Sequence, residues 1–268
     1  MVDLWREIAE MRARGESCAL CTIVKTHGST PGKQAMKMLV RADGTFAGTV
    51  GGGCLEAEVF EAALASLRDE RPRTLSFSLN ERDYPDSGLL CGGQLEIFVE
   101  PITEPRLFVF GGGHVSGALA ELARRVGFHV TVGDDRKTFA TPEAHPRAHE
   151  VRCASFDELA RSIAPAREHY VVVATRGHDQ DDVVLRALHA AGARPKYLGM
   201  IGSRSKKAQV FEKLRAAGVG DDFLATVRTP MGLPIGARTH EEIAVSVVAE
   251  MIQVRRLGSA DPASEATG

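Results

Sequence analysis

The stretch from Leu107 to Arg136 constrains the fold more than any other part of the sequence. It reads as a short all-apolar strand, "LFVF", then a glycine turn, a helix over about 114–126 with one apolar face, and a second strand, "FHVTV". An all-apolar strand is typical of a parallel sheet that is buried on both faces. Parallel neighbours also need a crossover connection between them, so this stretch predicts a βαβ unit.

The same alternation continues beyond this unit. Two further apolar strands, "YVVVAT" and "YLGMIG", alternate with the helical patterns "SFDELARSIA", "DDVVLRALHAAG" and "RSKKAQVFEKLRAAG", and a final helix is expected near 240–257. Alternating strands and helices predict a doubly wound parallel sheet. We therefore expect a Rossmann-like domain over residues 104–257. The tail at 258–268 has no apolar pattern and is expected to be disordered.

A smaller α+β domain is expected over residues 1–103. A helix over about 3–14 precedes the strand "CALCTIVKTHG", and "MKMLVR" and "TFAGTV" flank "ADG", which suits a hairpin with a type I′ turn. A helix after a glycine run and two alternating strands, "RTLSFSL" and "QLEIFVE", complete the pattern. The two prolines of "PITEP", at 101–105, mark the domain boundary. The fold class is therefore α/β, with a small α+β domain ahead of the Rossmann-like domain.

Composition and charge exclude several classes of partner. The 268-residue chain has a formal net charge of -2, which gives no electrostatic reason to expect nucleic acid or an anionic membrane. No apolar run approaches the roughly 20 residues of a membrane span, and the charged helical start is unlike a signal peptide. We therefore expect a cytoplasmic protein with reduced thiols, and the five scattered cysteines imply no disulfide framework.

The glycine turn after "LFVF" has the spacing of a phosphate-binding turn. Gly111, Gly113 and Gly117 fit G-x-G-x-x-x-G, a variant of the dinucleotide fingerprint in which bare backbone and a helix N-terminus face a phosphate. Asp134 and Asp135 lie about 20 residues downstream, where an acid can bind ribose hydroxyls. The spacing therefore predicts NAD(P) or another nucleotide, and Arg136 leaves NAD and NADP both open. The alternative is that the glycines serve helix–strand packing alone.

Polar residues follow two later strands of the expected sheet. Arg176 and His178 follow "YVVVAT", and Ser203 and Arg204 follow "YLGMIG". Ligands of open α/β sheets bind at the carboxyl ends of the strands, so this set fits a phosphate-bearing ligand. The competing interpretation is helix capping, for which Asp179 or Asp181 and Ser203 are natural residues, and both interpretations can hold together.

A second glycine-rich segment, "GTVGGGCLEAE", combines bare backbone with a thiol. The amides of Gly51, Gly52 and Gly53 predict an anion-binding concavity. Cys54 opens the helix that follows, and a helix N-terminus stabilises a thiolate. Together they predict a site for a ligand with a phosphate and a thiophilic centre. Cys91 also precedes two glycines and is expected nearby, although both cysteines could instead be small buried residues.

Cys18 and Cys21 form a C-x-x-C pair inside an expected strand. Residues three apart in a strand point to opposite faces, so the two thiols are not expected to share a metal ion. No second C-x-x-C completes a zinc site. We therefore predict that both cysteines pack in the core.

These motifs together resemble the XdhC/CoxI family, accessory proteins for the maturation of molybdenum hydroxylases. The resemblance extends from about Ser17 to Arg256. It is carried by an ordered set of segments: "HGSTPGKQAMKMLV", "GTVGGGCLE", "LLCGGQLEIFVEP", "VFGGGHVSGALAELA", "VTVGDDR", "ATRGHDQDD", "YLGMIGSRSKK" and "PIGARTHEEIAVSVVAEMI". It implies an N-terminal domain with the cysteine motifs and a C-terminal Rossmann-like domain. One position departs from the family pattern, because Pro31 is followed by Gly32 where family members often have arginine.

The resemblance implies a chaperone that binds the molybdenum cofactor, a molybdopterin with a phosphate or in a nucleotide form. Such a protein holds and shields the cofactor, assists its sulfuration and delivers it to a hydroxylase of the xanthine dehydrogenase or carbon monoxide dehydrogenase type. The implied partners are the large subunit of that hydroxylase and a cysteine desulfurase. A cofactor-binding chaperone is favoured over a catalyst. Cys54 would then contact the molybdenum or carry transferable sulfur.

The expected cofactor-binding residues come from both domains. They are Gly51, Gly52, Gly53, Cys54, Cys91, Gly111, Gly113, His114, Gly117, Asp134, Arg176, His178, Ser203 and Arg204, with Cys54 also the expected metal ligand. The rival hypotheses are an NAD(P)-dependent oxidoreductase that acts on a small molecule and a structural interaction protein without a ligand. The sequence has no Tyr-x-x-x-Lys proton-relay pattern that would support the oxidoreductase hypothesis. A homodimer is expected through an apolar face of the final helix formed by Ile243, Val247 and Val254.

Overall fold

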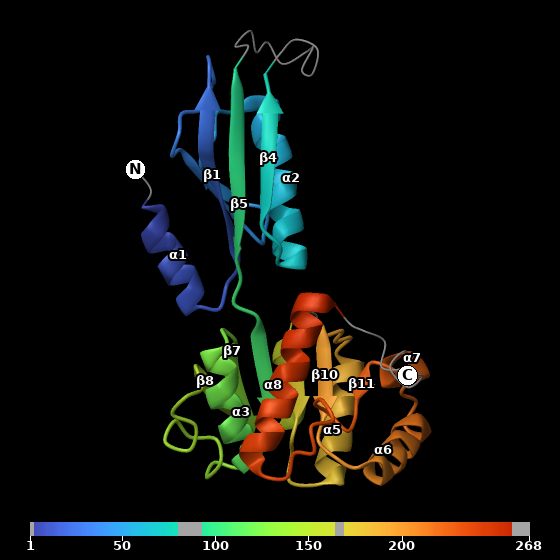
Figure 1. Cartoon of the computed structure of the whole chain (residues 1–268). Coiled ribbons are helices and arrows are strands. Elements are labelled where there is room, and N and C mark those ends of the chain that lie inside the picture. The colour runs from blue at the N-terminus through green and yellow to red at the C-terminus, as the bar shows by residue number, and fades with distance from the viewer. Residues whose placement is uncertain (1–2, 80–92, 164–168, 259–268) are drawn as a thin grey trace. The chain divides into compact units, whose positions relative to one another are not determined.

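The computed structural model describes residues 3–79, 93–163 and 169–258. The contacts divide the chain into two compact units, with the division between Glu104 and Pro105. Each unit has its own sheet (Figure 1) and its own buried core. Cys91 and the part of the tail beyond Gly258, both subjects of the sequence analysis, lie outside the described residues.

The N-terminal unit is a five-stranded antiparallel sheet with a helix on each face. Its elements are α1 (Leu4–Ala13), β1 (Cys18–His27), β2 (Lys37–Arg41), β3 (Phe46–Gly48), α2 (Gly53–Asp69), β4 (Arg73–Ser78) and β5 (Gln94–Ile102). The strand order is β3-β2-β1-β5-β4, and every pairing is antiparallel. The two long strands β1 and β5 therefore lie side by side inside the sheet, as Figure 1 shows.

Alternating side chains of β1 contribute to two separate cores. Cys18 packs with Ile8 and Met11 of α1, whereas Cys21 belongs to the cluster that contains Val59 of α2. The prediction that the two cysteines are core residues on opposite faces is confirmed, because both are fully buried. Burial raises the pKa of Cys18 to about 11 and the pKa of Cys21 to about 12. Both thiols are therefore protonated, uncharged core groups at neutral pH.

The β2–β3 hairpin turns differently from the sequence-based expectation. Gly44 has a left-handed φ of 83°, but Asp43 does not, and a type I′ turn needs positive φ at both central residues. The Asp43 carboxylate instead accepts a hydrogen bond of 2.9 Å from the Thr45 amide. The Arg41 amide donates to the Thr45 carbonyl at 2.8 Å. The turn is thus a three-residue loop that ends in a left-handed glycine, and the type I′ prediction was wrong.

The C-terminal unit is a six-stranded parallel sheet with helices on both faces. Its elements are β6 (Arg106–Phe110), α3 (His114–Arg125), β7 (His129–Asp134), β8 (Glu150–Cys153), α4 (Phe156–Ile163), β9 (Tyr170–Val173), α5 (His178–Ala190), β10 (Tyr197–Met200), α6 (Arg204–Ala216), α7 (Asp221–Leu224), β11 (Val227–Arg228) and α8 (His240–Leu257). The strand order β11-β10-β9-β6-β7-β8 is that of a Rossmann fold. The predicted fold class is confirmed.

Successive residues of β6 point into two different cores. Leu107 and Val109 pack with residues of α3 and α8 on one face, and Phe108 and Phe110 pack with residues of α4, α5 and α6 on the other. This alternation explains why "LFVF" is apolar throughout. It also holds the glycine turn after β6 between two helical layers.

Two edge strands and one short helix were missed by the sequence analysis. β8 has no buried residue and β11 has only two residues, so neither presents an apolar run. α7 is a single turn of four residues, which is too short for a helical period to be recognised. These elements lie at or near the margins of the sheet, and the central strands were predicted without them.

The apolar face of α8 lies inside the C-terminal unit. Val247 and Val254 are buried, and Ile243 packs against the same cluster, which also contains Leu119 of α3. The prediction that this face forms a dimer surface was therefore wrong, because a helical period does not distinguish an internal apolar face from an external one. Among the helices in the described parts of the chain, none is long and apolar enough to cross a bilayer.

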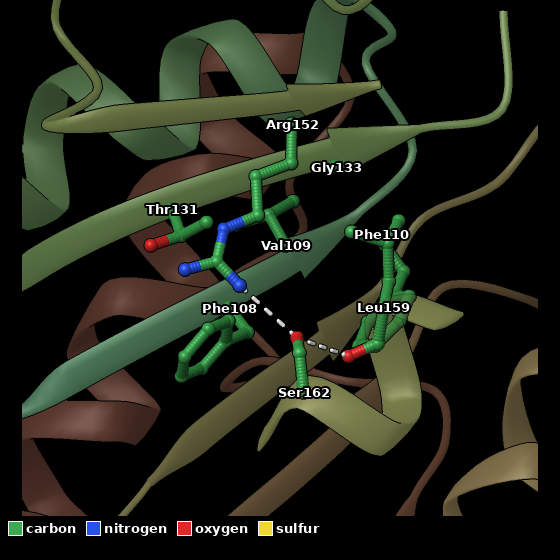
Figure 2. Close-up of a pocket in the computed structure, with 8 residues that line it drawn as sticks. All are labelled: Phe108, Val109, Phe110, Thr131, Gly133, Arg152, Leu159 and Ser162. Atoms are coloured by element: carbon green, nitrogen blue, oxygen red, sulfur yellow. Dashed lines mark hydrogen bonds between the residues drawn. The ribbon is translucent and has the colours of Figure 1, made fainter. Parts of the chain in front are cut away.

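A bare glycine lets α4 approach the sheet closely. A Cβ at Gly133 would lie 2.6 Å from the Leu159 side chain. Next to this contact is a cavity of about 10 Å³, where Arg152 donates to the Ser162 hydroxyl at 3.0 Å and that hydroxyl donates to the Leu159 carbonyl at 2.7 Å (Figure 2). Such a volume is at the limit for a single water molecule, so the cavity is a packing gap rather than a ligand site.

Candidate functional site

The turn between β6 and α3 lies where the strand order of the parallel sheet reverses. β6 has β7 on one side and β9 on the other, and ligands of open α/β sheets bind at such a switch point. Gly111 follows β6 with a left-handed φ of 105°. A Cβ there would lie 2.3 Å from the Ala174 carbonyl oxygen. Gly111 is therefore needed for close packing against the loop that follows β9.

The next two glycines of the fingerprint are not packed in this way. Gly113 is the N-cap of α3 and Gly117 is the fourth residue of that helix. An added Cβ at either position would meet no atom within 4 Å. Bare backbone that faces open space at a helix N-terminus suits a phosphate. Close helix–strand packing therefore does not account for glycine at these two positions.

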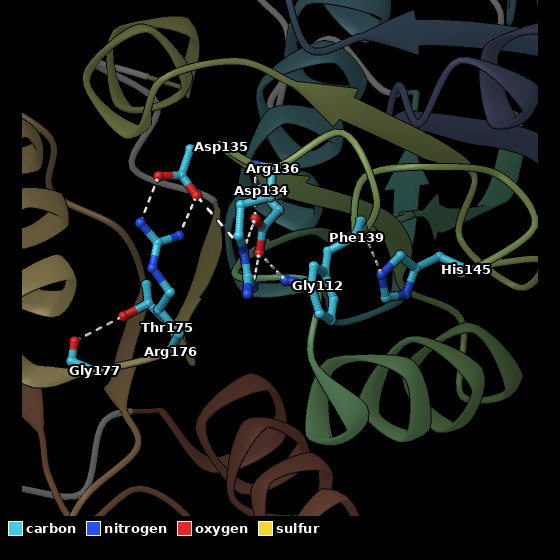
Figure 3. A network of polar contacts seen from close by, with 9 residues as sticks. All are labelled: Gly112, Asp134, Asp135, Arg136, Phe139, His145, Thr175, Arg176 and Gly177. Carbon is cyan, nitrogen blue, oxygen red and sulfur yellow. Dashed lines mark hydrogen bonds and ion pairs between the residues drawn. The ribbon is translucent and has the colours of Figure 1, made fainter.

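Asp134 is the last residue of β7, and its carboxylate accepts hydrogen bonds from neighbouring groups of the protein (Figure 3). Its Oδ1 accepts from the amide and the Nε of Arg136, both at 2.9 Å. Its Oδ2 accepts from Arg136 Nη2 at 2.9 Å and from the Gly112 amide at 2.8 Å. A carboxylate has about four lone-pair sites, so the side chain expected to bind ribose has none left in this conformation.

The electrostatics of Asp134 agree with this structural role. Burial acts to raise its pKa, but the hydrogen bonds from Arg136 and from the Gly112 amide outweigh burial and lower the pKa of Asp134 to about 2. The guanidinium of Arg136 also lies 3.7 Å from the centroid of the Phe139 ring. Asp134 and Arg136 therefore fix the glycine turn against β7.

A second ion pair lies at the same edge of the sheet (Figure 3). Nη1 of Arg176 lies 2.6 Å from Oδ1 of Asp135, and Nη2 lies 3.1 Å from Oδ2. Asp135 follows β7 and Arg176 follows β9, so the pair spans the carboxyl end of β6, the strand between them. Both side chains are partly exposed, at 41% for Arg176 and 27% for Asp135.

The other residues predicted at the strand ends have simpler positions. Ser203 is the N-cap of α6, and its hydroxyl accepts from the Lys206 amide at 3.2 Å, so the capping interpretation is confirmed for this residue. Arg204 is the exposed first residue of α6. His178 is the first residue of α5, and its side chain lies outside the described part of the chain.

The sequence analysis missed a buried ion pair at this edge. Lys206 Nζ lies 2.5 Å from Oδ2 of Asp181, which has no exposed surface. The Thr175 hydroxyl donates to Oδ1 of Asp181 at 2.5 Å. The pair connects the first turns of α5 and α6. Its signal in the sequence is the helical period, because Asp181 lies three residues before the buried Val184 and so faces inward.

Two helix N-termini meet beside the glycine turn. His114 is the first residue of α3 and His240 is the first residue of α8, and their rings stack with centroids 5.2 Å apart and planes 9° apart. Thr239 and Glu242 form a capping box that fixes the start of α8. His240 was not predicted as a site residue, although the T-x-x-E pattern of that box places it at a helix start. Helix N-termini carry partial positive charge and favour anions.

In the N-terminal unit, the glycine loop binds a side-chain carboxylate of the same chain. The run at 51–53 has left-handed φ values of 130°, 84° and 66° in chain order. The Glu56 carboxylate accepts from the Val50 amide at 3.1 Å and from the Thr49 hydroxyl. It also interacts with the amides of the first two glycines. The predicted concavity is therefore present, and Glu56 occupies it.

Hydrogen bonding keeps Glu56 charged in this loop. Partial burial acts to raise its pKa, but the hydrogen bonds from the Thr49 hydroxyl and from the loop amides outweigh burial and hold the pKa below its ordinary value. Successive amides with left-handed backbone form a concavity that stabilises negative charge. The loop therefore binds a carboxylate by the same chemistry that would bind a phosphate oxygen.

Cys54 is the second residue of α2, and its side chain is exposed. This contrasts with Cys18 and Cys21 of the same unit, which are fully buried. Cys153 of the C-terminal unit is also exposed, but it is the last residue of the edge strand β8 and has no glycine loop beside it. Among the cysteines that the structure describes, Cys54 is the one that combines exposure, a helix N-terminus and the glycine loop.

Close backbone contacts bring further loops to the Cys54 loop. A Cβ at Gly32, the position that departs from the family pattern, would lie 2.3 Å from the Val50 carbonyl oxygen, so no side chain fits on the backbone as it stands. A Cβ at Gly93 would lie 2.1 Å from the Ser29 carbonyl oxygen. The chain just after Cys91 is thus packed against the loop that leads to Gly32, while Cys91 itself lies outside the described residues.

The larger hollow of the C-terminal unit lies away from the glycine turn. It measures about 510 Å³ and is lined by parts of α6, α7 and β11 and by Glu250 of α8. The strand order separates β11 from β6 by two strands. Within the described ranges, no group of three or more His, Cys, Asp or Glu is arranged to hold a metal ion. Among these residues Cys54 does not belong to such a group.

Comparison with known families gives a consistent result for both units. Residues 107–251 match the family described as the XdhC Rossmann domain. Residues 11–78 match the family described as the XdhC and CoxI family. The two matches follow the two units of the structure in order.

Three curated proteins are similar over most of the chain. "Uncharacterized protein YqeB" of Escherichia coli (strain K12) is 33% identical over 257 residues, which cover 95% of this chain and 46% of that protein. A protein described as a probable xanthine dehydrogenase subunit, from Bacillus subtilis (strain 168), is 25% identical over 320 residues, covering 90% and 94%. "Molybdenum cofactor insertion chaperone PaoD" of Escherichia coli (strain K12) is 24% identical over 280 residues, covering 93% and 87%. The chain thus spans about half of the first relative's length and most of the other two.

A solved structure has a similar fold. The crystal structure of a xanthine dehydrogenase from Bacillus halodurans matches with a TM-score of 0.53 and 21% sequence identity, and the match covers 98% of each chain. At this identity the similarity concerns the fold alone. It supports an α/β fold that extends over the whole chain.

Proposed function

Because the chain belongs to the XdhC and CoxI family, we propose that it is an accessory chaperone for the molybdenum cofactor. Relatives named for cofactor insertion and for xanthine dehydrogenase support this role. The cargo is a molybdopterin, in a phosphate or a nucleotide form. The chain itself is proposed to be cytoplasmic, and its client is a molybdenum hydroxylase of the xanthine dehydrogenase or carbon monoxide dehydrogenase type.

The observation that carries the proposal is the exposed Cys54 beside a loop whose amides bind a carboxylate. The donors that Glu56 uses suit an anion, and a phosphate of the cargo has the same requirement. A cysteine sulfur is a soft ligand that suits a thiophilic metal. In this proposal Cys54 contacts the molybdenum or carries sulfur for transfer, and the loop from Gly51 to Gly53 binds the phosphate in exchange for the Glu56 carboxylate, which must leave these donors.

The glycine turn of the C-terminal unit is assigned to the nucleotide or pyrophosphate part of the cargo. Open backbone at Gly113 and Gly117 admits phosphate oxygens. Arg176 follows β9 and Arg204 follows β10, so both residues come after the carboxyl ends of strands, and a guanidinium suits bidentate contacts to phosphate. His114 at the start of α3 adds a further donor.

Delivery of the cofactor requires two kinds of partner, one that supplies sulfur and one that receives the cofactor. The molybdenum centre supplies oxidation–reduction chemistry to the client enzyme, whereas this chain's residues bind, orient and release the cargo. Sulfuration needs a sulfur donor, so we assign a cysteine desulfurase as one partner. The large subunit of the hydroxylase is the recipient.

The test compares two exposed cysteines. Cys54→Ala and Cys153→Ala would be purified from cells that coexpress the cofactor pathway, and molybdenum and released pterin would be measured by elemental analysis and fluorescence. We expect Cys54→Ala to lose molybdenum loading or activation of the hydroxylase, and Cys153→Ala to match the wild type. Unchanged molybdenum loading and unchanged activation of the hydroxylase in Cys54→Ala would rule out the proposed role of this thiol.

The open glycine turn also keeps an NAD(P)-dependent oxidoreductase as a second candidate function. The hydrogen bonds that Asp134 accepts from Arg136 and Gly112 count against it, because they use the acceptor sites expected to bind ribose. Tyr170 and Tyr197, the two tyrosines in the described residues, are both buried and so are poorly placed as proton donors. Titration with NAD and NADP tests this candidate, and the absence of binding to either would exclude it.

A further inference from the structure

The ion pair between Asp135 and Arg176 crosses the place where a ligand phosphate would enter. Asp135 follows β7, Arg176 follows β9, and the carboxyl end of β6 lies between them. The β6–α3 turn packs directly beneath, because Gly111 touches the Ala174 backbone. Figure 3 shows the pair beside Gly112 at this edge. The pair and the open backbone of the turn therefore belong to one site.

The two acidic residues at this edge are held very differently. Asp134 is 1% exposed and accepts four hydrogen bonds, one of them from the Gly112 amide. Asp135 is partly exposed and forms its short contacts, at 2.6 and 3.1 Å, with Arg176, while Arg136 Nε lies 3.9 Å away. Asp134 is a fixed part of the turn, whereas Asp135 can leave its partner without exposing a buried charge.

We propose that Asp135 is a displaceable internal anion, which holds Arg176 until a phosphate of a nucleoside diphosphate group takes its place. The inference rests on the proposed function, in which the glycine turn binds the nucleotide or pyrophosphate part of the cargo. A guanidinium forms the same two parallel hydrogen bonds to a carboxylate and to a phosphate. Exchange of one for the other therefore costs Arg176 no hydrogen bond.

The exchange sets the affinity of the site. Partly exposed ion pairs contribute little to the free energy of folding, so the folded protein loses little stability when Asp135 and Arg176 separate. Asp135 nevertheless competes with every phosphate that enters, and it takes Arg176 back when the ligand leaves. A chaperone must release what it binds, and Asp135 supplies an intramolecular competitor for that release.

The experiment measures ADP binding to the full chain by calorimetry, because ADP carries a diphosphate and is simple to handle. Asp135→Asn should bind ADP about fivefold more tightly than the wild type, which corresponds to the usual strength of a partly exposed ion pair. Arg176→Gln should bind about tenfold more weakly, because it loses a bidentate contact. Adenosine, which lacks phosphate, should not respond to either change. Equal or weaker ADP binding by a folded Asp135→Asn protein would overturn the inference.

The double variant separates a local exchange from a general effect of charge. In the Arg176→Gln background, Asp135→Asn should no longer tighten ADP binding, because the released guanidinium is absent. The matched control is Asp157→Asn, which removes the same charge from an exposed ion pair with Arg161 in α4. If Asp157→Asn, or Asp135→Asn in the double variant, tightened ADP binding fivefold, the effect would be long-range electrostatics and the inference would fail. Asp135→Ser repeats the test if the asparagine variant does not fold.

The result is separable from the fate of the proposed function. If the wild-type chain carries no molybdopterin but the ADP affinities follow the expected order, the proposed function fails and the exchange at Arg176 stands. If the chain carries the cofactor and the ADP affinities do not depend on Asp135, the inference alone fails. Absence of ADP binding to every variant also overturns it.

Discussion

The carboxylate of Glu56 accepts a hydrogen bond of 3.1 Å from the backbone amide of Val50, six residues earlier in the chain. This contact closes the glycine loop ahead of α2 and fills its anion-binding concavity. The conformation of the loop is therefore stabilised by a carboxylate of the same chain, and the exposed Cys54 follows the loop directly. The first prediction concerns the carboxylate that holds this loop.

Glu56→Gln should destabilise the N-terminal unit by about 1 kcal/mol at neutral pH, because it weakens hydrogen bonds to a charged acceptor. Since folding lowers the pKa of Glu56, its contribution is fully present above the unfolded-state pKa and is lost as the pH falls through the folded-state pKa. Urea unfolding at pH 7 and in mild acid checks this. The exposed Glu58 gives the control, Glu58→Gln, and an equal loss in the two variants would contradict the prediction.

The described cysteines should fall into two classes of reactivity. Cys54 and Cys153 are exposed and should be alkylated by iodoacetamide in the folded protein within minutes at pH 8. Cys18 and Cys21 are buried, and burial raises their pKa values to about 11 and about 12, so they should react only after unfolding. Peptide mass spectrometry gives the labelling at each position. Rapid labelling of Cys21 in the native state would contradict its burial in the sheet.

Two glycines of one fingerprint should respond in opposite directions to alanine. Gly111→Ala should destabilise the C-terminal unit by about 3 kcal/mol or more, because a Cβ at left-handed φ would meet the Ala174 carbonyl oxygen at 2.3 Å. Gly117→Ala lies inside α3 with no atom within 4 Å of the added Cβ, and should stabilise by roughly 0.5–1 kcal/mol. Thermal unfolding by circular dichroism measures both effects.

The same pair of variants separates folding from binding. If Gly117 is bare in order to admit phosphate, Gly117→Ala should fold more stably and yet bind ADP more weakly than the wild type. A stabilised Gly117→Ala protein with unchanged ADP affinity would show that the open space at α3 is not used by this ligand.

Asp134 should give the C-terminal unit a distinct acid dependence. Folding lowers its pKa from 3.8 to about 2, so its stabilising contribution of about 2 kcal/mol is complete above pH 4 and is lost as the pH falls from about 4 to 2. Asp134→Asn should therefore be less stable at pH 7 and should approach the wild type near pH 2. The control is Asp222→Asn, whose exposed side chain lies 3.6 Å from Arg194 and should change stability by less than about 0.5 kcal/mol. A constant difference between Asp134→Asn and wild type across this range would contradict the assignment.

The fold could be predicted from the sequence wherever burial imposes a pattern. The strand from Arg106 to Phe110 is apolar throughout because successive residues enter two cores, and this pattern indicated the parallel sheet. β8 and β11 carry no such pattern, because one has no buried residue and the other has two residues. The apolar face of α8 was recognised but assigned to a dimer. Helical periodicity indicates that an apolar face is buried, but it does not indicate whether the same chain or a second copy buries it.

The candidate site shows a different limit of sequence analysis. The residue types at the strand ends were predicted, but their partners were not. Asp134 was expected to face a ligand and instead holds Gly112 and Arg136. Glu56 was not singled out, although it occupies the predicted anion site. Short-range spacing identifies groups able to bind an anion, whereas the choice between an external anion and one from the chain depends on three-dimensional neighbours.

The placement of Cys18 and Cys21 on opposite faces of β1 decides how the N-terminal unit responds to oxidants. Residues three apart in a strand have Cα atoms about 10 Å apart, whereas a disulfide needs a separation below about 7 Å. The C-x-x-C pair therefore cannot close into a disulfide while β1 stays in the sheet. Among the described cysteines of the N-terminal unit, Cys54 is the exposed one that an oxidant meets first, and reduction of its sulfur requires no rearrangement of the core of that unit.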